Sequence, residues 1–434
     1  MATVSSVTET CSFHVLAVRS QFKENVNADR VPPGSPGICS RGGRQTKKPA
    51  RTSVILRQES WIGSAGRWCA RQLSSGGLRG VGVLGILARL GGGISIGAIN
   101  AAIIAGNSPE NRVERLRSFW DEITGSTCRW LVAAWQQQKM SALTALMFGQ
   151  PGFFTPRPSE EWFSLGNVIS YYDTSVLKGT LERLVDFDRI NKAKDVRLSV
   201  GAVNVRTGEF SYFDSANMRI GAEHVMASGA LPPAFPSVEI DGEHYWDGGL
   251  CSNTPLEYVL DYSPRRSRLI FQVDVFHARG RLPTDLGEVS EREQDIRYAS
   301  RTKVCSKAFR DKHDVRHAIN ELYKLLPPDI ASTQQAKQLY EHGCVTEMDI
   351  VQLVYRAAEP QGASKGYDFS RSSMQRLWQH GISDARTALR ASPWLAPMPK
   401  DLGVRVFDGR ESARAESQPA HSFAFPQIRD FSHP

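Results

Sequence analysis

Apolar residues in the middle of the chain fall into two kinds of pattern, one typical of buried strands and one of amphipathic helices. Nearly continuous apolar runs at 196–205 and 269–276 predict buried strands of the kind that parallel sheets contain. A further strand at 209–214 follows the first across a short turn. Residues 113–123 and 174–187 carry apolar side chains at helical spacing. This alternation of helices and strands predicts an α/β sandwich.

The same pattern indicates where some helices and loops begin. Ser108 and Pro109 predict the start of the helix that contains 113–123, because serine is a favoured N-cap and proline fits the first helical turn. An amphipathic stretch at 131–148 predicts another helix. The aromatic segment 149–156 follows it, and predicts either a lid or membrane-touching loop or a packed connection.

After about Ala278 the pattern changes to long, charged helices. Helical spacing extends over 300–326, 329–342 and 370–389. One apolar run at 351–355 predicts a strand among these helices. The C-terminal part of the chain is therefore expected to be mainly helical.

The first candidate for chemistry is a serine between two glycines, followed by an apolar, helix-like run that ends near Ala105. The segment consists of Gly93, Ile94, Ser95, Ile96 and Gly97. Gly-x-Ser-x-Gly is the pattern of a nucleophile elbow, in which a sharp strand-to-helix turn exposes the serine. The N–H groups and dipole of the following helix would face an attacked carbonyl. One segment is thus expected to supply both a nucleophile and electrostatic stabilisation.

Two other interpretations of this segment stay open. A glycine-rich turn that caps an ordinary buried helix has the same sequence. Residues 80–106 are also almost uncharged and long enough to cross a bilayer. Arg89, Asn100 and the many glycines disfavour a lipid-facing helix.

The second candidate is an aspartate followed by two glycines, at Asp247, Gly248 and Gly249. It leaves a hairpin pattern at 238–245, whose Asp-Gly pair at 241–242 predicts a two-residue turn. The glycines would let the carboxylate approach another loop closely. A plain turn aspartate is the alternative. His244 alternates along the expected strand and is interpreted as a hairpin side chain.

Together the two motifs resemble those of the patatin-like phospholipases. The segments 199–205, 226–233 and 247–256 are similar to core strands and the catalytic loop of bacterial members. The resemblance runs from about Gly93 to about Asp408 and includes the C-terminal helical region of one bacterial subgroup. It implies a three-layer α/β/α sandwich of patatin type with a mainly helical C-terminal region.

The resemblance also implies an activity. A serine hydrolase of lipid acyl esters, of phospholipase A, lipase or esterase type, would use Ser95 as nucleophile and Asp247 as base, through an acyl-enzyme. Its partner is a lipid or acyl-ester substrate, with transient contact at a membrane surface. No cofactor and no metal are implied, and nucleic acid is not expected as a partner.

The expected oxyanion loop is the part of the pattern that fits worst. The best match to the family's glycine loop comprises Gly76, Gly77, Leu78, Arg79 and Gly80. It lies fewer residues before Ser95 than a helix and a strand need. Either the loop has been rebuilt on a shortened scaffold, or the region before about Gly91 results from a frameshift or a wrong gene model, which we prefer. The alternative function is then a catalytically impaired lipid- or acyl-binding protein.

Charge and composition divide the 434 residues unevenly. Residues 1–70 hold ten Lys or Arg and only four Asp or Glu, and are interpreted as a disordered or artefactual segment. We expect a patatin-like hydrolase domain at 71–278, a helical region at 279–408 and a polar tail at 409–434. A basic arm that binds nucleic acid or anionic lipid is the other interpretation of the first segment.

The positions of the cysteines and histidines bear on the cellular compartment of the protein and on whether it binds a metal. Seven scattered cysteines without a C-x-x-C pair, and no convincing signal peptide, favour reduced thiols in a cytoplasmic protein that contacts membranes only peripherally. Cys251 is expected to be a buried structural thiol. His313 and His317 have the spacing of a metal pair but lack the accompanying glutamate, and are expected to face solvent or pair with Asp314 and Glu321.

Overall fold

The computed structural model describes most of the chain between residues 90 and 408, together with one strand near the N-terminus. The described residues are 14–19, 90–124, 141, 143–158, 168–192, 196–252, 255–256, 258, 265–274, 276–356, 368–399 and 402–408. The predicted segments 76–80, 1–13, 20–89 and 409–434 therefore lie outside them.

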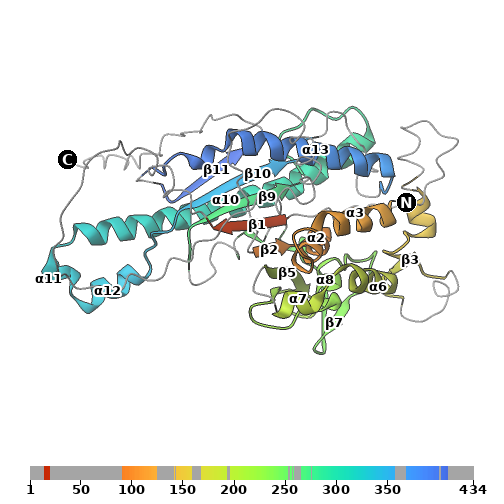
Figure 1. The fold of residues 1–434 in the computed structure, drawn as a ribbon, viewed down its shortest axis with the longest axis horizontal. Coiled ribbons are helices and arrows are strands. Elements are labelled where there is room, and N and C mark those ends of the chain that lie inside the picture. Colours follow the sequence, from red (N-terminus) through yellow and green to blue (C-terminus); the bar gives the residue numbers. More distant parts are fainter. Residues whose placement is uncertain are drawn as a thin grey trace, which may run out of the picture.

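A mixed β-sheet forms the centre of the molecule (Figure 1). Its strands lie in the order β11-β10-β9-β1-β2-β5-β8-β7, with β6 also paired to β5. The strands are β1 (His14–Arg19), β2 (Leu90–Gly93), β5 (Arg197–Asn204), β6 (Phe210–Asp214), β7 (Val238–Ile240), β8 (Glu243–Asp247), β9 (Arg268–Asp274), β10 (Met348–Val354) and β11 (Val404–Asp408). β2 runs parallel to β5, and β9, β10 and β11 are parallel to one another. The predicted strands at 196–205, 209–214, 269–276 and 351–355 are confirmed within a few residues.

Alternate residues of β9 show that helices cover both faces of the sheet. Ile270 packs with Phe309 of α10 (Leu286–Leu325). Phe271, on the opposite face, packs with Ala388 of α13 (Arg371–Ala391) and with Trp394. A strand's successive side chains point to opposite faces, so α10 and α13 lie on opposite sides of the sheet. The fold is an α/β/α sandwich with a helical C-terminal region, as the sequence predicts.

The largest apolar cluster lies on the face that α13 covers. It joins Val200 and Ala202 of β5 to α2 (Ile96–Ala105), α3 (Arg112–Ile123), α6 (Ser175–Leu184) and α8 (Ala222–Ser228). α2 is the centre of this cluster, with nine buried residues of its ten. Burying an apolar side chain fully is worth roughly 1.5–3 kcal/mol, so α2 is held mainly by packing. Trp120 Nε1 on α3 also donates a hydrogen bond of 3.0 Å to Asn100 Oδ1.

Two helix boundaries differ from the sequence prediction. The helix expected to start at Ser108 begins at Arg112, because 108–111 form a turn in which the Asn111 N–H bonds to the Ser108 carbonyl at 2.9 Å. The helix expected over 174–187 ends at Leu184, where Val185 is extended, and α7 (Phe187–Lys192) follows. Both helix boundaries are set by tertiary contacts, which the spacing of apolar residues along the sequence does not reveal.

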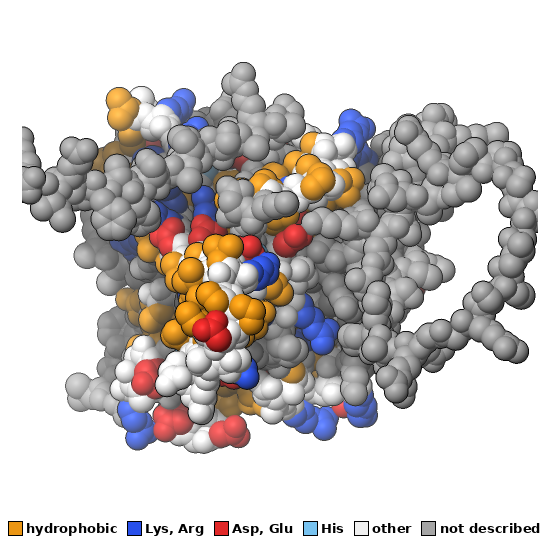
Figure 2. All heavy atoms as spheres, turned by 90° about the vertical axis from the view of Figure 1, so that its left-hand side faces the viewer, with side chains coloured by type: hydrophobic (Ala, Val, Ile, Leu, Met, Phe, Trp, Pro, Cys, Tyr) orange, Lys and Arg blue, Asp and Glu red, His pale blue; other side chains and the backbone are white. Residues whose placement is uncertain are grey.

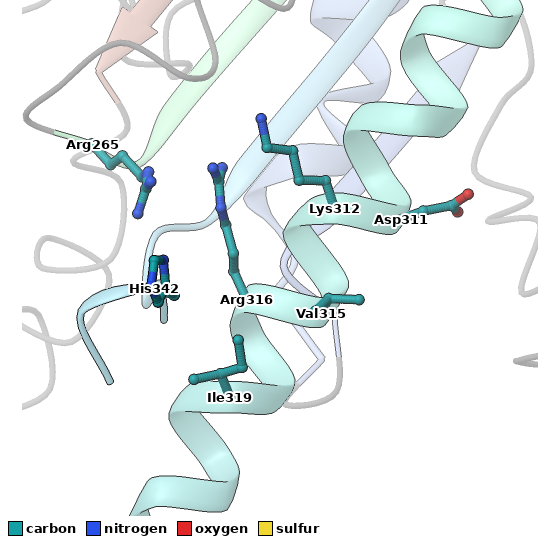
Figure 3. A pocket seen from close by; sticks show the side chains of 7 residues that line it. All are labelled: Arg265, Asp311, Lys312, Val315, Arg316, Ile319 and His342. Carbon is teal, nitrogen blue, oxygen red and sulfur yellow. The ribbon is translucent and has the colours of Figure 1, made fainter. Parts of the chain in front are cut away.

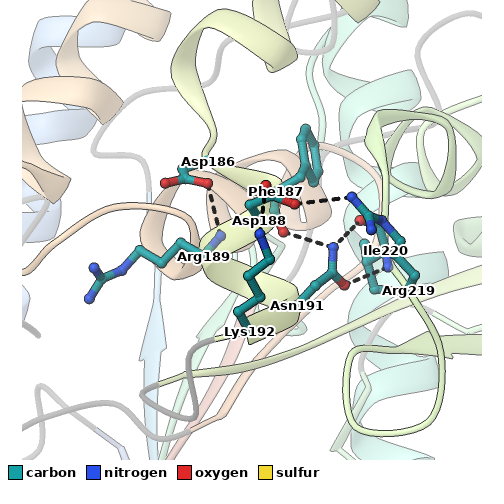
Figure 4. Close-up of polar contacts among 8 residues, drawn as sticks. All are labelled: Asp186, Phe187, Asp188, Arg189, Asn191, Lys192, Arg219 and Ile220. Carbon is teal, nitrogen blue, oxygen red and sulfur yellow. Dashed lines mark hydrogen bonds and ion pairs between the residues drawn. The ribbon is translucent and has the colours of Figure 1, made fainter.

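Polar contacts tie α7 to the segment that leads into α8 (Figure 4). Asn191 donates to the Phe187 and Ile220 carbonyls and accepts from the Ile220 N–H. Asp188 forms exposed ion pairs with Lys192 and Arg219, each of the kind worth about 0–1 kcal/mol. The partly buried hydrogen bonds between the Asn191 side chain and backbone groups are thus the stronger anchor, and they fix the approach to α8.

The second half of α10 projects from the body together with α11 (Pro328–Ala331) and α12 (Gln334–Glu341) (Figure 1). Figure 2 faces the free end of this arm, where hydrophobic side chains gather. Exposed apolar residues of the arm are Leu322, Leu325, Ile330, Leu339 and Tyr340. Within the described residues, no helix is both long and apolar enough to cross a membrane. Of the run at 80–106 that suggested such a helix, residues 96–105 form the buried α2.

The histidine pair on α10 holds the arm to the sheet. His313 is buried, and the Nε2 atoms of His313 and His317 both lie 2.8 Å from the Thr346 carbonyl oxygen, just before β10. The expectation that these histidines face solvent is wrong for His313, because a backbone carbonyl inside the fold is its partner. Their role in the described structure is a helix-to-strand contact.

β1 lies between β2 and β9 and runs antiparallel to both. It falls within residues 1–70, which the sequence suggested to be disordered or artefactual, and for these six residues the structure differs from that expectation. Most of its residues belong to a short apolar run at 13–18, which is too short for the core of a signal peptide and which the sequence pattern does not mark as a strand. The direction of this strand bears on the active site.

Candidate active site

β5 brings the two predicted catalytic residues to one point. Along the first half of β5, Ser199 and Val200 pair with β6 on one edge and with β2 on the other. Along its second half, β8 takes the place of β2, while β6 continues on the opposite edge. β2 and β8 therefore meet head to head on the same edge of β5.

The register places Ser95 and Asp247 at this meeting point. Gly93, the last residue of β2, pairs with Val200, so Ser95 lies two residues further, at the level of Ala202. Asp247, the last residue of β8, pairs with Ala202 itself. Residues some 150 positions apart in the sequence thus end their strands opposite one another. This is the geometry that a serine-carboxylate pair requires.

Ser95 has the strained backbone of a nucleophile elbow. Its φ of 58° and ψ of −130° are rare for a residue with a side chain, and such a conformation costs about 1–3 kcal/mol. The conformation is held from outside, because the Ser95 N–H bonds to both the carbonyl oxygen and the Oγ of Ser228, at 3.0 and 3.1 Å. Ser228 Oγ in turn donates to the Gly201 carbonyl at 2.6 Å. The buried Ser228 therefore links the elbow to β5.

Two glycines make the close approach possible. A Cβ on Gly93 would lie 2.2 Å from the backbone of Gly97, inside the first turn of α2. A Cβ on Gly248 would lie 2.5 Å from the Gly201 carbonyl oxygen and 3.1 Å from Ile94. The elbow and the aspartate loop thus both depend on the absence of a side chain, as the sequence motifs predict. Gly249 has a different role, because its N–H donates a hydrogen bond to the Asp247 carboxylate.

The Asp247 carboxylate is completely buried, with one of its oxygens held and the other open. Oδ1 accepts the Gly249 N–H at 2.7 Å, whereas Oδ2 has no hydrogen-bond partner among the described residues. Burial raises the pKa of Asp247 to about 7, against the opposing effects of the Ser95 side chain and the Gly249 N–H. The Ser95 hydroxyl thus interacts with a carboxylate whose pKa is matched to proton transfer near neutral pH.

One amide at the start of α2 is available beside Ser95. The N–H groups of Gly97, Ala98 and Ile99 bond to the carbonyls of Ile94 and Ser95. Among the described residues, no hydrogen bond uses the Ile96 N–H. The amide that follows a nucleophile is the usual first donor of an oxyanion hole. The helix dipole of α2 adds positive potential at the same point.

The direction of β1 restricts where a second donor can come from. His14 pairs with Gly93 and the strand then runs away from Ser95, so its last residue, Arg19, lies at the opposite end of the sheet. Gly76–Gly80 lie outside the described residues. Nine residues lie between Gly80 and Leu90, so the ten chain steps between them can span up to about 33 Å, several times the length of the four-residue β2, and chain length alone allows this loop to reach Ser95.

Family comparisons agree with this geometry. Residues 73–260 match the family model described as Patatin-like phospholipase, and residues 296–401 match a second model described as Patatin phospholipase. The chain belongs to the patatin-like phospholipase family. The first match contains the elbow, the aspartate loop and the segment Gly76–Gly80. The second covers much of α10, α12, β10 and α13. No curated protein matches the chain.

Other predicted residues of this patatin-like protein are placed as follows. Ile94 is buried beside Gly248, and the aromatic loop is a packed connection, since Phe154 is buried against Tyr172 and Phe235. Cys251 is exposed, so its interpretation as a buried thiol is wrong. His244 lies in β8 and contacts Ser237, as expected of a hairpin side chain.

Sequence reasoning missed the role of Ser228. The segment that contains it was compared only with core strands of the family, whereas Ala222–Ser228 form a helix, α8. The signal available was a serine followed by glycine at the end of a short apolar helix. Nothing in its sequence position indicates that its carbonyl and hydroxyl meet the Ser95 amide.

Proposed function

We propose that this chain is a lipid acyl hydrolase that acts through a Ser95–Asp247 dyad. Family membership supports hydrolysis of lipid esters in general. The observation that carries the dyad is the head-to-head meeting of β2 and β8 on one edge of β5. It brings a strained serine and a buried carboxylate with an open oxygen to the same position.

In the acylation step, Ser95 Oγ attacks the carbonyl carbon of the substrate ester and Asp247 Oδ2 accepts the hydroxyl proton. The carbonyl π electrons move to oxygen, and the Ile96 N–H and the α2 dipole stabilise the resulting oxyanion. When the tetrahedral intermediate collapses, the proton passes from Asp247 to the departing alcohol. The acyl group is left as an ester on Ser95.

In the deacylation step, Asp247 accepts a proton from a water molecule, which attacks the acyl-enzyme carbonyl. Collapse of this second intermediate returns the proton to Ser95 Oγ and releases the fatty acid. Asp247 must be ionised at the start of both steps. Its elevated pKa makes it a stronger base than an exposed aspartate once it is ionised.

The direction of β1 supports a second candidate function, an impaired lipid- or acyl-binding protein. Because β1 begins beside Gly93 and its last residue, Arg19, lies at the opposite end of the sheet, the C-terminal end of β1 does not deliver an oxyanion loop to Ser95. A site with only the Ile96 donor would lose about a hundredfold to a thousandfold in rate, which is the usual effect of removing one donor. We favour the hydrolase, since Gly76–Gly80 are within reach and the elbow and carboxylate are intact.

Labelling of Ser95 by a fluorophosphonate probe, together with short-chain ester hydrolysis, tests the proposal. Wild-type protein should be labelled and active, and Ser95→Ala should be neither. Ser118→Ala, which alters an exposed serine of α3, is the matched control and should behave as wild type. Folded wild type that binds lipid without labelling or turnover would favour the impaired protein.

A further inference from the structure

Apolar side chains near the candidate active site are exposed to solvent in two short segments. The first segment is helical at 143–148, and the second, at 168–169, precedes β4 (Tyr172–Asp173). We call their exposed apolar residues the apolar rim, which consists of Leu143, Met147, Phe148, Val168 and Ile169. Keeping apolar area in water is unfavourable, and such exposed groups mark binding surfaces when several of them occur together.

Both segments of the apolar rim rest on one packed aromatic cluster. Ala145 of the first segment and Tyr172, just after the second, are buried in this cluster with Phe154. The Tyr172 hydroxyl donates a hydrogen bond of 2.9 Å to the Leu146 carbonyl, which joins the two segments. The rings of Phe154, Tyr172 and Phe235 contact one another. The rim is therefore mounted on a close-packed part of the fold.

The chain that supports Ser95 also supports this cluster. A Cβ added to Gly229 would lie 3.9 Å from the Ser95 Cα, so Gly229 is beside the elbow. Four residues further along, the Pro233 carbonyl accepts the Tyr171 N–H at 3.0 Å. Four residues span at most about 14 Å, so the second segment of the rim is anchored close to the elbow.

The apolar rim and its surroundings carry almost no charge. Among the described residues 141–158 and 168–172, Arg157 is the only charged one, and its Nε donates to Ser170 Oγ at 3.1 Å. The next carboxylate, that of Asp173, accepts the Ser175 N–H at the start of α6. An uncharged surface with Leu, Met, Ile and Phe suits a membrane interface, where apolar side chains enter the boundary between headgroups and acyl chains.

The projecting arm, which also exposes apolar residues, lies at the other end of the molecule. β2 and β9 both run antiparallel to β1, and β10 is parallel to β9, so β2 and β10 point the same way. Ser95 follows the end of β2, whereas the arm meets the sheet just before β10, where His317 contacts Thr346. Figure 1 shows β3 (Thr155–Pro156), which pairs with β4, on the side of α2 away from the arm.

Charged side chains occur throughout that other end. The cavity beside α10 is lined by several of them (Figure 3), which include Arg265, Asp311, Lys312 and Arg316. The apolar residues at the free end of the arm (Figure 2) alternate along the chain with exposed charged ones, which are Glu321, Lys324, Asp329 and Lys337. Moving charges from water into an acyl layer is costly. The uncharged rim near Ser95 is therefore the better match for a lipid surface.

We propose that the apolar rim is the surface through which this protein contacts a lipid–water interface. The proposal rests on the lipid acyl hydrolase function proposed above, and it assigns the membrane surface as the partner of that site. The five side chains of the rim enter the outer part of the acyl layer. The ester groups of membrane lipids lie at about this depth, so the contact brings them to the end of the sheet that carries Ser95.

Flotation of the full chain with phosphatidylcholine vesicles at high salt tests the contact. All proteins carry Ser95→Ala, so that the lipid is not consumed. Met147→Ser combined with Phe148→Ser should weaken binding at least about tenfold, because two apolar side chains no longer leave water. Both residues are exposed, so the urea unfolding midpoint should stay unchanged. Binding of the parent protein should persist at high salt, because apolar contact is not screened.

A pair of leucines on the arm provides the matched control. Leu322 and Leu325 are 62% and 81% exposed, compared with 62% and 75% for Met147 and Phe148. Leu322→Ser combined with Leu325→Ser removes a similar apolar area at the other end of the molecule and should float as the parent protein does. Equal loss of binding in both double variants overturns the proposal. Binding that requires anionic lipid and disappears at high salt overturns it as well.

Activity measurements separate this proposal from the proposed function. With Ser95 present, the ratio of vesicle-lipid hydrolysis to soluble-ester hydrolysis should fall about tenfold in the Met147/Phe148 double variant. Vesicle binding through the rim without any ester hydrolysis would remove the hydrolase and leave the contact surface. Hydrolysis of a soluble ester without vesicle binding would overturn the surface alone. A dimer in sedimentation that dissociates in the same double variant would assign the rim to a second copy of the chain and overturn the membrane contact.

Discussion

α2 and α10 are opposite kinds of helix, and they lie in regions of the molecule that are held together in different ways. α2 has ten residues, nine of them buried, and no charged side chain. α10 has forty residues, many charged, and its second half projects from the body. Ser95, the proposed nucleophile, stands immediately before the first turn of α2, whereas α10 presents many long, charged side chains to solvent.

The difference shows which groups hold each region in its geometry. At α2 the important groups are backbone amides, glycines and a strained φ angle, and they are fixed by the core around them. At α10 the important groups are long side chains on a helix whose solvent-facing positions tolerate change. Changes near α2 should therefore affect folding and turnover together, and changes on α10 should affect stability while leaving turnover intact.

The largest expected effect comes from adding a single methyl group at the elbow. Gly93→Ala would place a Cβ 2.2 Å from the Gly97 backbone, and neither segment can move without displacing α2 from the core. We expect a loss of more than about 4 kcal/mol in the free energy of unfolding, or failure to fold. Urea denaturation and soluble yield measure it.

Gly179→Ala is the matched control, because nothing lies within 4 Å of its added Cβ in α6. A helical glycine replaced by alanine should gain up to about 1 kcal/mol. A Gly93→Ala protein as stable and active as wild type would show that the elbow is not held as the structure has it.

The second largest effect is expected from replacing Asp247, the proposed base. Asp247→Asn cannot accept a proton, so kcat should fall by about 10²–10⁴-fold. In wild type, kcat/KM should rise with pH and level off above about 7, because only the ionised Asp247 is active. A pH profile of ester hydrolysis measures both. Activity of Asp247→Asn near that of wild type would remove this residue from the mechanism.

Stability should change with pH in the opposite direction to activity. The pKa of Asp247 is about 7 in the folded protein, above its ordinary value of 3.8, so the folded state binds the proton more tightly. The stabilisation is complete below about pH 4 and is lost as pH rises through about 7. The unfolding midpoint of wild type should therefore fall between about pH 4 and 7 relative to that of Asp247→Asn, and level off above about pH 7. Parallel midpoints would contradict a buried carboxylate.

Local sequence motifs predict the two candidate residues, whereas the arrangement that brings them together depends on pairing between distant segments. Gly-x-Ser-x-Gly and Asp-Gly-Gly mark Ser95 and Asp247 because tight turns need glycine at definite positions. The helix at 96–105 and the strand at 196–205 follow from their apolar runs. By contrast, the replacement of β2 by β8 along β5 depends on register between segments far apart. Periodicity within a segment contains no such information.

The same reason explains the missed elements. β1 is a short apolar run in a polar segment, and only its neighbours in the sheet distinguish it from a loop. Ser228 acts through its carbonyl oxygen and hydroxyl on a residue 133 positions away. His313 is buried because β10 presents a carbonyl to it. Each of these roles is set by a tertiary partner.

A smaller effect is expected at Ser228, which we regard as a positioning residue. Ser228→Ala keeps the carbonyl bond to the Ser95 N–H but removes the Oγ that joins it to Gly201. The elbow should loosen, and kcat should fall about fivefold, since a net hydrogen bond is worth about 1 kcal/mol. KM should stay unchanged, because Ser228 is fully buried and acts on the Ser95 backbone and Gly201. A rise in KM alone, or no change in kcat, would exclude a positioning role.

The smallest effect on turnover is expected on α10. His317→Gln removes one of two hydrogen bonds to the Thr346 carbonyl and should lower the free energy of unfolding by about 0.5–1.5 kcal/mol. Because His317 lies at the end of the sheet opposite Ser95, kcat should remain that of wild type. Lys307→Gln, which breaks only an exposed ion pair, should change stability by less than about 0.5 kcal/mol. A fall in kcat for His317→Gln without a comparable fall for Lys307→Gln would mean that the arm and the dyad are coupled. The separation between the buried helix and the projecting one would then not hold.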